Sequence, residues 1–350
     1  MVIKMLIIND FFKRSKEAVS NQMEYLLDKA GGKIVTATRF MKQKAFQKED
    51  RLDKIYIYPP ILYNILLPFY VLFSKDDIHI FEEEPSLYKR LICNLSQRKL
   101  YISMYREPYH KYAEHLKKYK NLSGIFVESD YHKEKLIRYG FKKSLVHVSY
   151  TPAKVPRKSN EKKIDLSHIN LLFASWNNAE GDPLAERGLI YLLDLLAINK
   201  NFYLTILLRD DRTAKFIEEV KNRKLESKVR LLDVNEKELV EEFDKCDFVV
   251  YPIQKKLTKD IPNSLIDGIS RGKPVILSTI FGFSKIVDSE KIGYVIEPNT
   301  RPIKFNIQEK EYYSMSKKAF EVSKKYTKYL YVKNILKNYK GDTNDESSNN

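Results

Sequence analysis

The stretch "IPNSLIDGISRGKPVILS", residues 261–278, predicts a short helix that leads directly into a buried strand. Asn263 and Ser264 are residue types that often begin helices, and Gly272 is the type that most often follows the last helical turn. The β-branched segment that comes next, residues 274–278, is typical of a strand inside a sheet. A helix joined so closely to a buried strand indicates an α/β protein with a parallel sheet.

The N-terminus of this helix is a candidate site for an anion. The first N–H groups of a helix have no carbonyl partner within it, and the helix dipole adds positive charge there, so a phosphate group fits. Asp267 lies one turn further on, where its carboxylate could accept hydrogen bonds from sugar hydroxyls. The alternative is that Asn263 and Ser264 only cap the helix and that Asp267 is a solvated acid.

Strands and helices alternate along the rest of the chain in two series. The first series has strand-like segments at residues 2–8, 33–38, 77–81, 99–104, 124–129 and 144–150, with helical segments at 15–30 and 129–140. The second series has strand-like segments at residues 169–175, 202–208, 229–233, 247–253 and 292–298, with helical segments at 188–199, 213–224 and 236–246. We therefore expect two Rossmann-like domains, with ligands beyond the carboxyl ends of the strands.

Changes in composition set the predicted boundaries. We expect an N-terminal, acceptor-binding domain at residues 1–155, a linker rich in Pro and Lys at 156–168, and a C-terminal, nucleotide-sugar-binding domain at 169–309. The amphipathic segment at 310–340 is expected to return to the first domain. The polar tail at 341–350 predicts disorder.

The composition predicts a folded protein with an acidic partner. The chain has 350 residues, 43% of them hydrophobic and 31% charged, which is typical of a globular protein with more than one core. The formal charge is +16, and residues 1–150 hold 27 Lys and Arg against 17 Asp and Glu. Nucleic acid, a phospholipid surface and a phosphorylated substrate each match this charge. Cys93 and Cys246 are too few for a disulfide framework and fit a reducing compartment.

The longest apolar run, "YPPILYNILLPFYVLF" at residues 58–73, is too short to span a bilayer, which takes about 20 residues. It predicts either a core helix or a patch that touches a membrane or a lipid-linked substrate. The apolar run at the start of the chain, "MVIKMLII", is too short for a signal peptide and predicts a first buried strand.

The motifs after residue 236 resemble, in order, the donor-binding half of GT-B glycosyltransferases, above all those of family 4. An acid-rich helix precedes a strand that ends in proline, and "DGISRGKPV" (267–275) takes the place of the family's helix–strand motif. "FGFSKIV" (281–287) takes the place of its glycine loop, and "GYVIEP" (293–298) that of its last strand. Upstream, residues 126–152 are similar to the end of the family's acceptor domain. The resemblance implies two Rossmann-like domains with a cleft between them and C-terminal helices that cross back to the first.

The resemblance also implies an activity. An enzyme of this kind moves a sugar from an NDP-sugar donor to an acceptor, which can be a glycan, a lipid-linked sugar or a protein, with retention and without a metal. The residues expected to bind the donor are Arg187, Lys255, Lys256, Lys259, Asn263, Ser264, Leu265 and Asp267. The three residues from Asn263 to Leu265 would hold the diphosphate through backbone amides, and Asp267 would contact the ribose. Arg187 would neutralise the anionic leaving group.

The chain departs from the family pattern at two positions of the donor site. Lys259 stands where the family has the first acid of its E-x7-E pattern, the acid that faces the donor sugar. The family's second basic residue falls near Trp176 and Asn177, and either Lys255 or Lys256 could replace it. A solvated lysine pair is the alternative.

In the N-terminal domain, charged residues follow three of the predicted strands. Lys13, Arg14 and Arg106 are candidate contacts for an acceptor or a phosphate. Glu82 and Glu107 are candidate catalytic bases only if the transfer inverts the anomeric centre, because an inverting enzyme must take the acceptor proton. A charged loop is the alternative for these acids.

No cofactor is expected, because the NDP-sugar is a substrate, and no metal, because the sequence lacks D-x-D and a paired histidine motif. Two other functions match single features. The charge fits a basic nucleic-acid-binding protein, although the lysines are scattered and no recognition motif occurs. A nucleotide-sugar 2-epimerase shares the fold. The expected location is the cytoplasm, with peripheral association at the cytoplasmic membrane face as an option.

Overall fold

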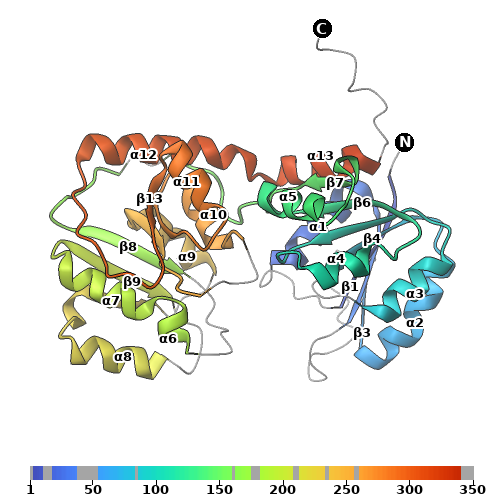
Figure 1. The fold of residues 1–350 in the computed structure, drawn as a ribbon, viewed down its shortest axis with the longest axis horizontal. Coiled ribbons are helices and arrows are strands. Elements are labelled where there is room, and N and C mark those ends of the chain that lie inside the picture. Colours follow the sequence, from blue (N-terminus) through green and yellow to red (C-terminus); the bar gives the residue numbers. More distant parts are fainter. Residues whose placement is uncertain are drawn as a thin grey trace, which may run out of the picture. The chain divides into compact units, whose positions relative to one another are not determined.

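The computed structural model describes residues 3–10, 18–37, 54–82, 86–159, 162–174, 182–207, 213–232, 236–255 and 260–339. The chain divides into two compact units (Figure 1). Unit 1 comprises Met1–Pro152 and Lys328–Asn350, and unit 2 comprises Ala153–Thr327. Each unit is a parallel sheet with helices on its faces, so the predicted α/β class is confirmed for both.

The sheet of unit 1 has the strand order β3-β2-β1-β4-β5-β6-β7, and all neighbours are parallel. Its strands are β1 (Met5–Asn9), β2 (Gly32–Ala37), β3 (Ile55–Tyr58), β4 (Asp77–Glu82), β5 (Leu100–Met104), β6 (Leu122–Val127) and β7 (Val146–Val148). The order reverses between β1 and β4, and the carboxyl ends beside such a reversal are where open α/β sheets bind ligands.

Helices cover both faces of this sheet. They are α1 (Ala18–Ala30), α2 (Pro60–Leu72), α3 (Leu87–Leu95), α4 (His110–Leu116), α5 (Asp130–Arg138) and α13 (Lys328–Tyr339). Along β1, Leu6 and Ile8 pack in the core beneath α2 to α5, whereas Met5 and Ile7 pack beneath α1 and α13. This alternation is the period of two that a strand imposes on its side chains.

The C-terminal helix α13 is anchored to the sheet of unit 1 by a buried histidine. His79 on β4 is fully buried, and its Nδ1 lies 2.8 Å from the hydroxyl of Tyr339 while its Nε2 lies 2.7 Å from Ser103 Oγ. Burial lowers the pKa of His79 to about 3, so the imidazole is neutral at physiological pH. The ring of Tyr339 also stacks on Tyr101, with centroids 3.7 Å apart.

The sheet of unit 2 has the strand order β10-β9-β8-β11-β12-β13, again with parallel neighbours. Its strands are β8 (Ile169–Ala174), β9 (Phe202–Leu207), β10 (Val229–Leu232), β11 (Phe248–Tyr251), β12 (Val275–Ser278) and β13 (Gly293–Ile296). Its helices are α6 (Pro183–Glu186), α7 (Leu189–Ile198), α8 (Thr213–Asn222), α9 (Glu236–Lys245), α10 (Asn263–Ser270), α11 (Ser284–Glu290) and α12 (Glu309–Val322). Here the order reverses between β8 and β11.

The structure differs from the predicted boundaries in two places. The expected linker at residues 156–168 is part of unit 2, because its polar groups bind that unit: Arg157 Nη2 donates to the Phe320 carbonyl at 2.8 Å. The segment expected to return to the first domain also divides. Helix α12 stays with unit 2, where Ser316 Oγ donates to the Gly272 carbonyl at 2.7 Å, and only α13 joins unit 1. The tail at 341–350 lies outside the described residues.

The contact between Tyr339 and His79 yields a stability prediction. Tyr339→Phe keeps the stacked ring but leaves a buried imidazole nitrogen without its partner, so we expect a loss of about 1–3 kcal/mol in the free energy of unfolding. Urea denaturation at pH 7 measures it. Tyr329→Phe on the same helix is the matched control, because that side chain is 70% exposed. Equal stability of the two variants would show that the hydroxyl of Tyr339 does not anchor α13.

Candidate functional site

Helix α10 begins at the carboxyl edge of the unit 2 sheet, but not with the expected cap. The N-cap residue is Pro262, without a side-chain cap bond, so the prediction that Asn263 or Ser264 caps the helix is wrong. The Ser264 hydroxyl instead accepts a hydrogen bond from Tyr251 Oη at 2.5 Å and donates to the Ala174 carbonyl. The helix start is thereby tied to the last residues of β8 and β11.

The other end of α10 closes as the sequence predicts. Gly272 adopts a left-handed φ of 66°, and its N–H donates to the Ile269 carbonyl at 3.0 Å. The N–H of Lys273 donates to the Gly268 carbonyl at 3.0 Å, which completes a Schellman motif. With Ile269 fully buried, the helix is fixed at both ends on the sheet.

Arg187 lies in a turn that packs against the end of β11. The next residue, Gly188, has a φ of 71°, and a Cβ at this position would lie 1.9 Å from the Pro252 carbonyl oxygen. Only glycine allows this approach. Burial lowers the pKa of Arg187, and the nearby Glu186 carboxylate opposes the shift. A partly desolvated guanidinium gains from an anionic partner. The predicted contact of Arg187 with a diphosphate stays a prediction.

Lys255 belongs to the same cluster as Arg187. Its ammonium lies 2.7 Å from a carboxylate oxygen of Glu186, and the N–H of Gln254 donates to the Glu186 carbonyl at 2.9 Å. The side chain of Lys255 is 68% exposed, so it can turn toward a ligand. The predicted contacts Lys256 and Lys259 lie outside the described residues.

Asp267 is buried and bound to the chain that enters unit 2. Its side chain accepts hydrogen bonds from the N–H groups of Lys154 at 2.7 Å and Val155 at 3.3 Å, both on Oδ1. The residue is 5% exposed, which rules out the alternative of a solvated acid. Its predicted contact with ribose stays a prediction. The N–H of Leu265 donates to the Pro262 carbonyl at 3.1 Å. The predicted contact of residues 263–265 with a diphosphate also stays a prediction.

Sequence reasoning gave no role to Asp260, the acid one position after Lys259. Asp260 is 6% exposed, and its Oδ1 accepts a hydrogen bond from the N–H of Gly282 at 2.6 Å. This contact fixes the loop between β12 and α11 beside the approach to α10. The sequence did carry a signal for Asp260, because it directly follows Lys259, the position where family 4 glycosyltransferases have the first acid of the E-x7-E pattern.

The candidate residues of unit 1 fall into two groups. The Glu107 carboxylate pairs with the Lys135 ammonium and accepts a hydrogen bond from Tyr131 Oη at 3.1 Å, and its side chain is 11% exposed. A carboxylate held by a cation is a poor base, because the partner stabilises the charged form. Arg106 is half-buried in the same loop after β5. Lys13, Arg14 and the side chain of Glu82 lie outside the described residues.

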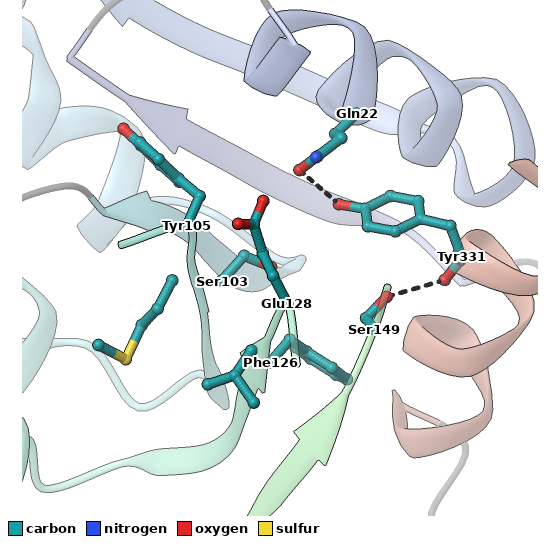
Figure 2. Close-up of a pocket in the computed structure, with 9 residues that line it drawn as sticks. Gln22, Ser103, Tyr105, Phe126, Glu128, Ser149 and Tyr331 are labelled. Atoms are coloured by element: carbon teal, nitrogen blue, oxygen red, sulfur yellow. Dashed lines mark hydrogen bonds between the residues drawn. The ribbon is translucent and has the colours of Figure 1, made fainter. Parts of the chain in front are cut away.

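Figure 2 shows a small cavity at the carboxyl ends of β5, β6 and β7, which sequence reasoning did not predict. The carboxylate of Glu128, a residue 5% exposed, points into it and accepts a hydrogen bond from Thr151 Oγ1 at 2.5 Å. Tyr331 on α13 donates to Gln22 Oε1 at 3.3 Å, and its carbonyl accepts from Ser149 Oγ at 3.3 Å. These bonds attach α13 to α1 and to the sheet edge. Within the described ranges, no three His, Cys, Asp or Glu residues group as metal ligands.

The turn at Gly188 provides a test of the cluster. Gly188→Ala forces a Cβ into the Pro252 carbonyl at a left-handed φ, so we expect a loss of about 3 kcal/mol or more in the free energy of unfolding. Gly140→Ala is the control, because Gly140 has a φ of 90° but its nearest neighbour would be Lys117 Nζ at 3.5 Å. That variant should lose only about 1–2 kcal/mol. Chemical denaturation compares the two, and equal losses would contradict the described packing.

Residues 184–332 match the model of the family Glycosyl transferases group 1. The match includes the Arg187 turn, Lys255 and all of α10, and therefore contains the candidate site of unit 2. No curated protein sequence matches the chain.

Solved structures share the fold over nearly the whole chain. HepE of Anabaena in complex with UDP is 12% identical, with a TM-score of 0.69 and coverage of 97% of this chain and 100% of that one. A glycosyltransferase from Rickettsia africae ESF-5 is 14% identical, with a TM-score of 0.67 and coverage of 97% and 98%. The lipopolysaccharide outer core galactosyltransferase WaaB, in its apo form, is 14% identical, with a TM-score of 0.68 and coverage of 96% and 99%. At such identities the likeness shows the fold alone.

These findings confirm the predicted GT-B fold and the predicted enzyme class. The fold rests on the two parallel sheets and the structural likeness, and the class rests on the family match over the domain that carries the candidate site. The chain therefore has the GT-B fold, and its residues 184–332 match the glycosyl transferases group 1 family.

Proposed function

We propose that the enzyme transfers a sugar from an NDP-sugar bound at the carboxyl edge of the unit 2 sheet. The observation that carries the proposal is the convergence of Arg187, Lys255 and the N-terminus of α10 on the ends of β8 and β11. HepE of Anabaena has been solved with UDP and with UDP-glucose. UDP and UDP-glucose are therefore the first ligands to test.

The diphosphate is expected to bind where the positive groups of this edge meet. The N–H groups of Asn263 and Ser264 are the first of α10, at the end of the helix where its dipole adds positive charge. The Arg187 guanidinium adds a full charge in a partly buried setting, where Coulombic attraction is stronger than in water. Because the departing nucleoside diphosphate is an anion, these groups would stabilise it as the glycosidic bond breaks.

Asp267 is proposed to bind the ribose while it holds residues 154 and 155. The two roles can be separated by substitution. Asp267→Ala removes the acceptor for both backbone N–H groups, so it weakens the structure as well as any ribose contact. Asp267→Asn keeps an oxygen for those N–H groups and removes only the charge.

We further propose that transfer retains the anomeric configuration and needs no metal or other cofactor. A retaining transfer requires no protein base for the acceptor, and Glu107 is already engaged by Lys135. The acceptor, a glycan, a lipid-linked sugar or a protein, is proposed to bind unit 1. We place the enzyme in the cytoplasm, in peripheral contact with the membrane, because the basic charge of residues 1–150 favours an anionic surface.

Thermal shift with nucleotides tests donor binding. We expect UDP or UDP-glucose to raise the melting temperature, and Arg187→Gln to weaken binding about 10- to 100-fold because a charge-assisted contact is lost. Arg223→Gln is the charge-matched control: Arg223 follows α8, at the opposite edge of the sheet, and pairs with Asp194 and Glu219. Asp267→Asn should weaken UDP binding without lowering the melting temperature of the free protein.

Other outcomes of the same assay would point elsewhere. If neither UDP nor GDP shifts the melting temperature, while plain DNA binds with a steep salt dependence, the result would contradict the donor site and support nucleic-acid binding by the basic surface instead. Release of free UDP together with a 2-epimerised sugar would indicate an epimerase.

Metal removal tests the proposed chemistry. After dialysis against EDTA, we expect turnover of the donor at an unchanged rate, because the positive groups at the unit 2 edge replace a metal. The anomer released from UDP-glucose, followed by proton NMR before mutarotation, should be α. A rate restored only by added Mg²⁺ or Mn²⁺, or an initial β anomer, would contradict this part of the proposal.

A further inference from the structure

We propose that the exposed apolar surface of α2 and α3 rests on an anionic lipid surface. This surface, called here the α2–α3 face, consists of Ile61, Ile65, Phe69, Phe73, Leu87, Leu91 and Leu95. The proposal rests on the peripheral association proposed above and deepens it, since it assigns the contact to named side chains of unit 1.

Helix α2 has apolar residues on two opposite sides. Tyr63, Leu67 and Val71 are buried in the core of unit 1. On the other side, Ile61, Ile65 and Phe69 repeat every four residues and are 68%, 57% and 59% exposed. The helix contains no charged residue. A helix that is apolar all round is normally covered on all sides, by protein or by lipid.

Helix α3 continues the exposed surface. Leu87, Leu91 and Leu95 also repeat every four residues and are 58%, 55% and 72% exposed. The two helices lie side by side at one margin of unit 1 (Figure 1), and Tyr88 Oη on α3 donates to the Asn64 carbonyl on α2. Six large apolar side chains on two adjacent helices, together with Phe73 at the C-cap of α2, form a patch of the kind that marks an interaction surface.

The basic residues beside the α2–α3 face favour an anionic lipid surface as its partner, and they disfavour a second copy of the chain. Neither α2 nor α3 contains an acid. Arg90 Nη1 on α3 lies 3.2 Å from His115 Nδ1 on α4. The side chain of Asn94, at the end of α3, hydrogen-bonds to the backbone of Lys118 and Lys120. Both of these lysines are exposed. A two-fold contact between two copies would bring these bases toward each other, whereas anionic headgroups would neutralise them.

The face would lie in the plane of the bilayer surface. Helix α2 has 13 residues and α3 has 9, whereas spanning takes about 20. Among the helices that the structure describes, none is both long and apolar enough to cross a membrane. Apolar side chains that enter the headgroup region, together with bases beside them, are the two features of an interfacial helix.

Vesicle flotation of the full chain tests the proposal. We expect binding to vesicles of phosphatidylcholine and phosphatidylglycerol in equal parts, weak binding to phosphatidylcholine alone, and release by salt. The double variant Phe69→Ser/Leu91→Ser should bind the anionic vesicles at least about tenfold more weakly, because it loses two apolar groups that the lipid would bury. Ile303→Ser is the matched control, since Ile303 is 54% exposed in unit 2.

Three results would overturn the proposal: no binding by the wild type, equal binding by the double variant, or equal binding to both vesicle types. A wild-type dimer in light scattering that the double variant converts to a monomer would assign the face to a second copy instead. The UDP thermal shift should be the same in the wild type and the double variant. If the wild type fails to bind lipid but still shows the UDP thermal shift, only the lipid proposal fails. If it binds lipid but shows no UDP shift, only the donor proposal fails.

Discussion

The position of α10 depends on three polar groups that meet at its first turn. The hydroxyls of Tyr251 and Ser264 and the carbonyl of Ala174 bond one another where β8 and β11 end. Because Tyr251 is fully buried, a broken bond here would leave a polar atom without water, which costs more than the bond contributes. The Schellman motif fixes the other end. The first amides of α10 therefore face one direction, and the Arg187 turn packs on the same strand end.

Most of the fold could be predicted because strands and helices here are short periodic segments with clear ends. The helix predicted at residues 129–140, for example, begins where Ser129 caps α5 by accepting a hydrogen bond from the N–H of His132 at 3.2 Å. Strand β3 escaped prediction, because its four residues run directly into the apolar sequence of α2 and only pairing with β2 defines it. The segment at 156–168 has the composition of a linker, and its polar residues turned out to be anchors whose partners lie far along the chain.

The sequence predicted where the candidate site lies, but it did not predict which contacts its side chains make. Parallel topology puts the loops after β8 and β11 at one edge, so the Arg187 turn and the start of α10 were expected to meet. The direction of each side chain depends on residues distant in sequence. Ser264 turns to Ala174, Asp267 binds the N–H of Lys154, and Glu107 pairs with Lys135. Nothing local in the sequence encodes these partners.

The attachment of α13 to unit 1 has a consequence for the order of synthesis. One core of unit 1 is closed by Tyr331, Val332, Ile335 and Tyr339, which the ribosome makes after all of unit 2. Until then Met5, Ile7 and Phe126 lack part of their cover, and His79 lacks the hydroxyl that completes its bonding. Most of unit 1 is thus synthesised first, but its core is completed only after unit 2 has been synthesised. Until then unit 1 exposes an apolar face that chaperones can bind.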